Sequence, residues 1–418
     1  MNHGSTLATL LICLGLTGVA AAGDWTEFRG PTGQGLSTES GLPTHWGGLR
    51  NLAWQIELPG KGWSSPILFE KHLYLTSAVP AGSGEEVRQS LRALCLDASS
   101  GKTIWNVELF EQPAGAPMHT KNSHASPTPV TDGKRLFVHF GPHGTACLAL
   151  KDGEVLWRNE ELKYSPVHGN GGSPALVDGA VVVSCDGSDA QFVAALEQDT
   201  GKLRWRTPRN FHPIKGFSFS TPLAIEVDGS QQIVSAGSAG VAAYEPGDGH
   251  EIWRVTYPGG YSVVPRPVYG LGLLFVCIGY DDPGVMAIKP EGAAGDVTAT
   301  HVAWRLKKGA PLNPSPLLVD DSLYLVSDDG RATCVDAETG KQRWQHRLQG
   351  NFSASPVYAD GKIFFQSEEG EGFVVKPGRS FHELAKNDFG ERTLASYAIG
   401  DGALFIRGEK HLARIEQK

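Results

Sequence analysis

The stretch DAETGKQRWQ, at residues 336–345, is the clearest copy of a motif that recurs along the chain. It joins a turn, a Gly-Lys pair and a single tryptophan on a short strand-like run. Equivalent positions follow one another at intervals of 40 to 52 residues. They are Trp54, Trp105, Trp157, Trp205, Trp253, Trp304, Trp344 and Leu384. A period of this length indicates a repeat architecture.

Each repeat is long enough for four short strands. Around Trp344 these are SPLLVD, SLYLVSD, ATCVDAE and QRWQHRL, and each is bounded by Gly, Asp or Pro. Asp-Gly pairs such as Asp329-Gly330 supply turns between strands. Four antiparallel strands repeated radially are typical of a β-propeller. The sequence therefore predicts an all-β, eight-bladed β-propeller of four-stranded antiparallel blades.

The two ends of the repeat region each supply an incomplete blade. A single outer strand, around Trp54, precedes the first full repeat, and three strands follow Leu384. We expect the N-terminal strand to complete the last blade, because this pairing removes two free strand edges. Seven blades is the alternative, if the terminal segments pair differently. The repeated tryptophans are predicted to be structural and to fill the wedges between blades.

The stretches CVDAETGKQRW and ALEQDTGKLRW resemble the repeat of pyrroloquinoline-quinone (PQQ) propellers. That superfamily contains quinoprotein alcohol dehydrogenases, BamB-like outer-membrane assembly proteins and secreted bacterial PQQ-like propellers without an assigned reaction. The opening segment DWTEFRGPTGQGLS is most similar to the last group. The resemblance runs from Trp54 to the end of the sequence and implies the propeller fold.

The first residues are typical of a secretory signal, with an apolar run at 7–19 followed by three alanines at 20–22. We expect a signal peptide at 1–22, an N-terminal arm at 23–50 and the PQQ-like propeller at 51–418. The expected product is monomeric, periplasmic or secreted, and has no transmembrane span after signal cleavage. A permanent membrane anchor and a lipid on Cys13 are the alternatives. The net charge of −8 argues against nucleic-acid binding.

Cysteines and paired acidic residues give no clear catalytic or metal signature. The five cysteines after the signal lie in apolar strand-like runs and are interpreted as small buried hydrophobic residues. The acidic turns GYDDPG, SDDG and SEEGEG are interpreted as solvated turns. No metal site is therefore predicted.

The loops before the first strand of each repeat carry the candidate site, because they surround one mouth of a propeller's channel. They combine polar groups with Trp63, Phe217, Phe219 and Phe352, and they precede Ser-Pro or Thr-Pro-like steps. Such a mixture suits a small ligand, although hydrated loop ends are the alternative reading. The predicted ligand-binding residues are His119, Asn122, His124, His168, Asn170, Ser218, Arg266, Asn313 and Asn351. Since Arg266 could hold a carboxylate, the predicted small ligand is anionic.

The resemblance implies two candidate functions. One is an exported, non-catalytic binding or assembly scaffold of the cell envelope, BamB-like, whose partners are envelope proteins or a small anionic ligand. The other is oxidation of alcohols or sugars with PQQ and calcium at the channel mouth. In the dehydrogenases a disulfide between adjacent cysteines lies over the quinone, and this chain has no adjacent cysteines. We therefore favour the scaffold, with neither cofactor required and no catalytic residue assigned.

Overall fold

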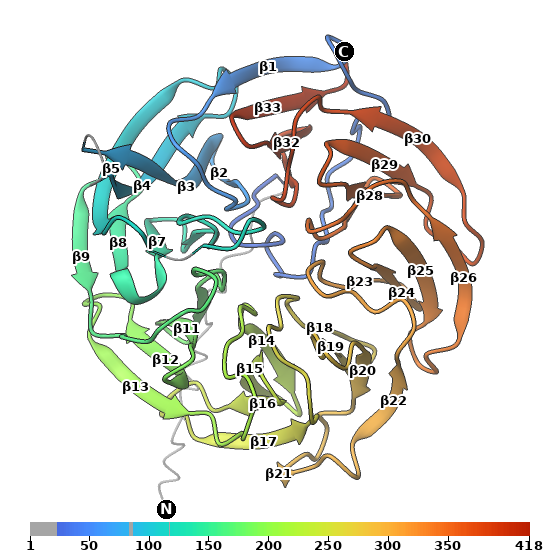
Figure 1. The fold of residues 1–418 in the computed structure, drawn as a ribbon. Coiled ribbons are helices and arrows are strands. Elements are labelled where there is room, and N and C mark those ends of the chain that lie inside the picture. Colours follow the sequence, from blue (N-terminus) through green and yellow to red (C-terminus); the bar gives the residue numbers. More distant parts are fainter. Residues whose placement is uncertain (1–22, 83–86, 117) are drawn as a thin grey trace, which may run out of the picture.

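Eight sheets surround a central channel in the computed structural model, which describes residues 23–82, 87–116 and 118–418 (Figure 1). Each sheet contains four antiparallel strands, and one sheet gains the short parallel strand β21 at its outer edge. The eight-bladed propeller is confirmed. The expected signal segment lies outside the described residues.

We number the blades in chain order, from the inner strand to the outer strand. Blade 1 consists of β2 (Ile67–Phe69), β3 (His72–Ala81), β4 (Arg88–Asp97) and β5 (Thr103–Gln112). Blade 2 consists of β6 (Val130–Thr131), β7 (Arg135–His139), β8 (Thr145–Ala149) and β9 (Val155–Asn159), with the 3-10 turn η1 (Gly141–His143). Blade 3 consists of β10 (Ala175–Val177), β11 (Ala180–Asp186), β12 (Gln191–Glu197) and β13 (Leu203–Pro208). Blade 4 consists of β14 (Leu223–Val227), β15 (Ser230–Gly237), β16 (Gly240–Tyr244) and β17 (Glu251–Thr256), with β21 (Gly295–Asp296).

The second half of the ring repeats this arrangement. Blade 5 consists of β18 (Val268–Gly270), β19 (Leu273–Cys277), β20 (Val285–Ile288) and β22 (Val302–Leu306). Blade 6 consists of β23 (Leu317–Val319), β24 (Ser322–Val326), β25 (Arg331–Asp336) and β26 (Gln342–Arg347). Blade 7 consists of β27 (Val357–Ala359), β28 (Lys362–Gln366), β29 (Glu371–Val375) and β30 (Glu383–Asp388). Blade 8 consists of β31 (Ala398–Gly400), β32 (Ala403–Arg407), β33 (His411–Glu416) and β1 (Leu52–Glu57).

The N-terminal strand closes the ring, as the sequence predicts. Strand β1 pairs antiparallel with β33, from Leu52 opposite Ile415 to Glu57 opposite His411 (Figure 1). The buried cluster that fills the junction of blades 7, 8 and 1 packs against Trp54. The last blade is therefore built from both ends of the described chain.

The repeated tryptophan joins most blades to the next. In six blades its indole Nε1 donates to a backbone carbonyl in the turn of the following blade, for example from Trp157 to Gln198 at 2.8 Å. The glycine of that turn, Gly201, lies against the Trp157 ring and has φ +70°. A Cβ there would lie 2.4 Å from the ring, so the Gly-Lys step is required by the contact as well as by the turn. Trp253 differs, because its Nε1 donates to Gln232 within its own blade.

A belt of hydroxyl groups lines the inner wall of the channel. In seven of the eight blades, the residue two positions before the first strand accepts a hydrogen bond from the equivalent backbone N–H of the preceding blade, at 2.9 to 3.1 Å. The hydroxyl residues are Ser65, Thr128, Ser173, Thr221, Ser315, Ser355 and Ser396. Blade 5 has Arg266 at this position, and the belt is interrupted there. In blade 2 the belt residue is Thr128, two positions after the Ser126-Pro127 step that the sequence analysis used.

The arm before β1 crosses the channel on the side away from the entering loops. Trp25 forms a β-bridge with Leu68 of blade 1, and Leu36 forms one with Tyr358 of blade 7. Between them, Arg29 donates to the carbonyl of Pro316 at 2.7 Å. The arm therefore closes one end of the channel, and Figure 1 shows this segment in the middle of the ring.

The cysteines of the blades lie in the core. Cys95, Cys147, Cys185, Cys277 and Cys334 are buried and unpaired, as expected. Among the residues that the structure describes, no helix is long and apolar enough to cross a membrane.

Candidate functional site

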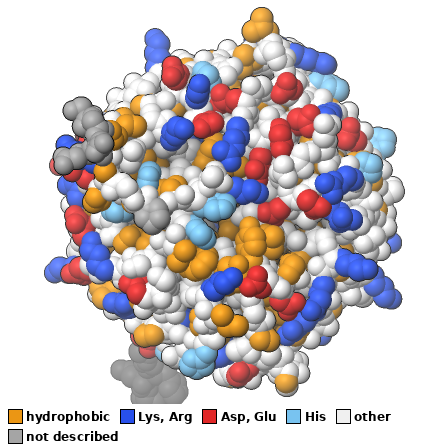
Figure 2. Space-filling model, in the orientation of Figure 1, with side chains coloured by type: hydrophobic (Ala, Val, Ile, Leu, Met, Phe, Trp, Pro, Cys, Tyr) orange, Lys and Arg blue, Asp and Glu red, His pale blue; other side chains and the backbone are white. Residues whose placement is uncertain are grey.

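The mouth of the channel opposite the arm holds a cavity of about 250 Å³. Its floor is formed by Phe28 of the arm together with belt hydroxyls, and its walls come from the loops that enter the blades. In Figure 2, hydrophobic and histidine side chains gather near the centre of this face, with acidic and basic side chains beside them. This cavity lies at the channel mouth, where the sequence analysis placed the candidate site.

One wall of the cavity is a continuous row of rings from blades 2 to 5. His119 lies 5.2 Å from His168, which packs edge-on against Phe217 at 5.1 Å between ring centroids. Phe217 contacts Tyr261 at 5.5 Å, and Tyr261 contacts Tyr280 at 6.0 Å. Burial and the neighbouring His119 lower the pKa of His168.

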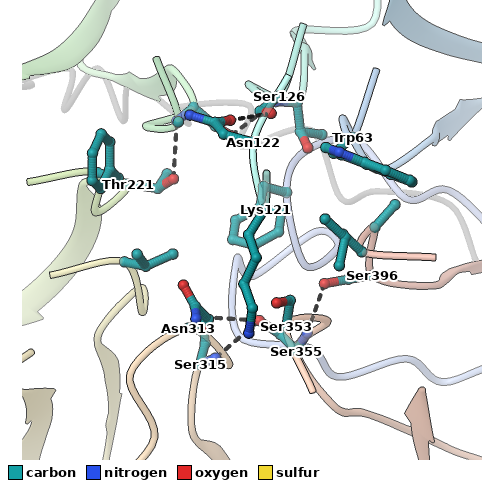
Figure 3. A pocket seen from close by; sticks show the side chains of 18 of the residues that line it. Trp63, Lys121, Asn122, Ser126, Thr221, Asn313, Ser315, Ser353, Ser355 and Ser396 are labelled. Atoms are coloured by element: carbon teal, nitrogen blue, oxygen red, sulfur yellow. Dashed lines mark hydrogen bonds between the residues drawn. The ribbon is translucent and has the colours of Figure 1, made fainter. Parts of the chain in front are cut away.

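Lys121 crosses the mouth from this side to the opposite side. It lies on the loop between β5 and β6, and its Nζ is 2.8 Å from Oε1 of Glu368 and 3.9 Å from Oδ2 of Asp328. Asp328 belongs to the β24–β25 turn of blade 6, and Glu368 to the β28–β29 turn of blade 7. Figure 3 shows the Lys121 side chain extending from the side of Asn122 and Ser126 toward Asn313 and Ser353.

The two carboxylates are held by their own blades as well as by Lys121. Asp328 Oδ1 accepts the backbone N–H groups of Leu312 at 2.9 Å and of Asn313 at 3.0 Å, while Oδ2 accepts the Asn313 side-chain amide. Glu368 accepts the Ser353 hydroxyl at 2.6 Å. Burial raises the pKa of Asp328, against the opposing effect of these hydrogen bonds.

The structure corrects the interpretation of the acidic turns SDDG and SEEGEG. Asp328 and Glu368 have only 17% and 11% of their side chains exposed, and each is hydrogen-bonded and paired with Lys121. Their neighbours match the prediction better: Asp329 is 54% exposed. Sequence reasoning missed the first acid of each turn, since nothing local distinguishes it from the second.

Four of the nine predicted ligand-binding residues line the cavity: His119, Asn122, His168 and Asn313. Their loops are also tied together. Asn122 donates its side-chain amide to the backbone carbonyl of His168 at 2.8 Å. Lys121, Trp63 and Tyr261, which the sequence places on the same loops, line the cavity too.

The other five predicted residues lie beside the cavity or beneath it. Asn170 accepts the Tyr164 hydroxyl, Ser218 bonds Ser238, and Asn351 donates to Glu369. His124 is half-buried, and burial lowers its pKa.

Arg266 is fully buried below the belt and does not face the mouth. Its guanidinium donates to the carbonyls of Pro222 and Phe28 and pairs with Glu27 of the arm at 2.8 Å. Every nitrogen of this fork already has a partner, so its geometry joins the arm to blade 5 and leaves no group for a ligand carboxylate at the mouth.

PQQ and calcium, which the family resemblance implies for dehydrogenases, can be tested against this donor set. Calcium requires roughly six to eight oxygen ligands. Glu368 and Asp328 supply carboxylates, but both oxygens of Asp328 already accept N–H groups of Leu312 and Asn313. The carboxylates of PQQ would need cationic partners, and Arg266 is occupied by Glu27. This arrangement does not fit the calcium–quinone pair.

Comparisons with known proteins give related results by sequence and by structure. A family model described as outer membrane protein assembly factor BamB matches residues 51–208, 89–276 and 292–396. The quinohemoprotein alcohol dehydrogenase ADH IIB of Pseudomonas putida is 27% identical over 80% of this chain, and the outer membrane protein assembly factor BamB of Yersinia pestis is 24% identical over 75%. The match covers 50% of the dehydrogenase and 77% of the Yersinia protein, so this chain spans about half the length of the former.

Two solved structures share the fold. BamB from Moraxella catarrhalis superposes with a TM-score of 0.62 at 12% identity, covering 88% of this chain and 97% of that one. The quinohemoprotein alcohol dehydrogenase from Comamonas testosteroni superposes with a TM-score of 0.67 at 11% identity, covering 96% and 82%. These likenesses concern the propeller architecture and do not separate an assembly factor from an oxidoreductase.

Proposed function

We propose that this chain, which belongs to the family of PQQ-like propellers described as outer membrane protein assembly factor BamB, is an exported, non-catalytic binding scaffold of the cell envelope. The observation that carries the proposal is the state of the mouth's charged groups. Lys121 is paired with Glu368 and Asp328 across the mouth, and Arg266 is paired with Glu27 below it. A general acid or base needs a group free to exchange a proton with a substrate, and these groups are engaged with one another.

The channel supports binding better than turnover for a second reason. The arm crosses the channel below the cavity, where Phe28 forms part of the floor, so a ligand would reach the cavity through the mouth that Lys121 crosses. The rigid ring around it presents loops from several blades to a partner, while the hydroxyl belt and the tryptophan joints hold those loops in place. A fixed, multi-loop surface of this kind suits recognition of another envelope protein.

Quinone chemistry is the function that the first experiment must distinguish from this proposal. The purified protein is titrated with PQQ in the presence and absence of calcium, and dye reduction is then measured with alcohols and sugars. We expect no calcium-dependent quinone binding and no dye reduction. Calcium-dependent binding at the mouth, followed by substrate-dependent dye reduction, would replace the scaffold with the oxidoreductase.

A second experiment tests the scaffold itself in the native host. Cells that lack this chain should contain less folded outer-membrane protein, measured by heat-modifiable migration of β-barrel proteins in gels. Wild-type chain should restore the amount, and so should a variant with an exposed change away from the mouth, Lys151→Ala. Unchanged outer-membrane protein in the deletion strain would contradict a role in assembly.

A further inference from the structure

We propose that the channel mouth is a binding site for a primary ammonium group on an apolar stem, and that Lys121 occupies this site in the free protein as an intramolecular stand-in. This inference rests on the proposed binding function and names the chemistry of its ligand. The ammonium subsite consists of Glu368, Asp328 and their immediate hydrogen-bonding partners.

The subsite is assembled without help from Lys121. Asp328 is fixed by the backbone N–H groups of Leu312 and Asn313, and Glu368 is fixed by the hydroxyl of Ser353. These partners lie on blades 6 and 7, or on the loops that enter them, whereas Lys121 comes from the loop that enters blade 2. The carboxylates would therefore keep their positions when the lysine leaves, so the site needs no further ordering to bind another ammonium group.

Lys121 is the most exposed of the three partners. Its side chain is 31% exposed, against 11% for Glu368 and 17% for Asp328. The Lys121 side chain must stay extended across the cavity to reach the two carboxylates, and this lowers the conformational entropy of a side chain with several rotatable bonds. Because the ligand would supply the same charge, exchange leaves neither carboxylate buried without a partner.

The charges around the mouth favour a cation over the anion that the sequence suggested. The basic groups here already lie on acceptors: Lys215 lies 4.0 Å from the centroid of Tyr261, and Arg392 lies 5.7 Å from that of Trp63. Lys215 also contacts Asp281 at 3.4 Å. Burial lowers the pKa of His168, which disfavours a positive charge on this ring. Burial acts to lower the pKa of Lys121 too, but Glu368 and Asp328 outweigh it and raise the pKa.

The residues that line the cavity indicate the chemistry of the ligand beyond its ammonium group. Its walls include Phe28, Trp63, Phe219 and Tyr280, so an apolar stem would pack against aromatic faces. Such rings also attract a cation that passes over them. A free alkylamine and a lysine side chain presented by a partner protein share this chemistry.

The experiment removes the Lys121 side chain and adds a free primary ammonium compound in its place. Lys121→Ala is titrated with n-butylammonium, with n-butanol as the uncharged probe, by calorimetry and thermal shift at constant ionic strength. We expect n-butylammonium to bind this variant at least tenfold more tightly than wild type and to raise its melting temperature, while n-butanol does neither. The matched control Lys151→Ala, an exposed lysine outside the mouth, should behave like wild type.

A second substitution links the effect to the carboxylate. Glu368→Gln in the Lys121→Ala background should weaken n-butylammonium binding at least tenfold. The single variant Glu368→Gln, compared with wild type, gives the same test if Lys121→Ala does not fold, since wild type should bind the amine weakly and Glu368→Gln more weakly still. Equal effects of amine and alcohol, or binding that is independent of Glu368, would overturn the proposal.

A pair of peptides distinguishes the two sources of the ammonium group. N-acetylated, C-amidated Gly-Lys-Gly is compared with the equally blocked Gly-norleucine-Gly, so that the two peptides differ only in the side-chain ammonium group. Tighter binding of Gly-Lys-Gly than of n-butylammonium supports a lysine on a protein partner, and equal affinity supports a free amine. Failure of every amine to bind, with the outer-membrane phenotype intact, would remove this ligand class and leave the scaffold function standing.

Discussion

Replacing Gly201 by alanine tests the claim that the Gly-Lys-x-x-Trp motif is a joint between blades. Two effects add at this position. An L-residue at φ +70° costs about 1–2 kcal/mol, and the new Cβ, 2.4 Å from the Trp157 ring, adds an overpacking cost of about 1–3 kcal/mol. We expect a total loss of about 2–5 kcal/mol in the free energy of unfolding.

Gly229→Ala is the matched control, because it has the same backbone strain without the contact. Gly229 has φ +75°, and a Cβ there would meet no atom within 4 Å. Its expected loss is about 1–2 kcal/mol, so the difference between the two variants isolates the contact with tryptophan. For a cooperative unit of this size each kcal/mol lowers Tm by only about 1 °C, and urea midpoints are the better measurement. Equal losses in the two variants would refute the joint.

Three other predictions address the belt, the pH dependence and the closure. Ser355→Ala leaves the buried N–H of Ser315 without an acceptor and should cost about 1–3 kcal/mol by urea unfolding; an unchanged midpoint would show that the belt is dispensable. Burial lowers the pKa of His139 to about 3 from 6.5, so the unfolded chain binds the proton first and stability falls as pH drops from 6.5 toward 3, by about 1.4 kcal/mol per pH unit. His139→Gln should flatten that slope in urea titrations at several pH values, and an unaltered slope would assign it to other groups. Deleting residues 1–57 removes the strand that pairs with β33 and should lower Tm more than any of these substitutions; a truncated protein that melts like the full chain would contradict closure through β1.

More of the fold than of the candidate site could be predicted from the sequence. The spacing of Trp54 to Trp344 identifies the blades because each tryptophan makes the same contact with the turn of its neighbour in all but one case. The site depends on distances across the ring, and a repeat pattern does not contain them. The repeat pattern places Lys121 on one loop and Glu368 on another. Predicting the contact between them would also require the diameter of the channel and the direction of both side chains.

Arg266 shows a second limit of sequence reasoning. Its loop enters blade 5 at the mouth, yet Arg266 holds the belt position and its side chain turns toward the arm. A comparison of the repeats within this sequence could have indicated its role, because Arg266 stands where most other repeats have the Ser or Thr of a Ser-Pro or Thr-Pro step. Its partner Glu27 lies in the arm, outside the repeat, so the pattern could not supply it.

The pairing of β1 with β33 sets an order on the formation of the protein. Strand β1 precedes the seven complete blades in the sequence, but its partner is the last strand that the structure describes. Until β33 emerges, the edge of β1 stays unpaired, and closing so long a loop is entropically unfavourable and slow. Formation of the last blade therefore depends on two segments that are far apart in the sequence, and the outer edge of that blade stays unpaired until they meet.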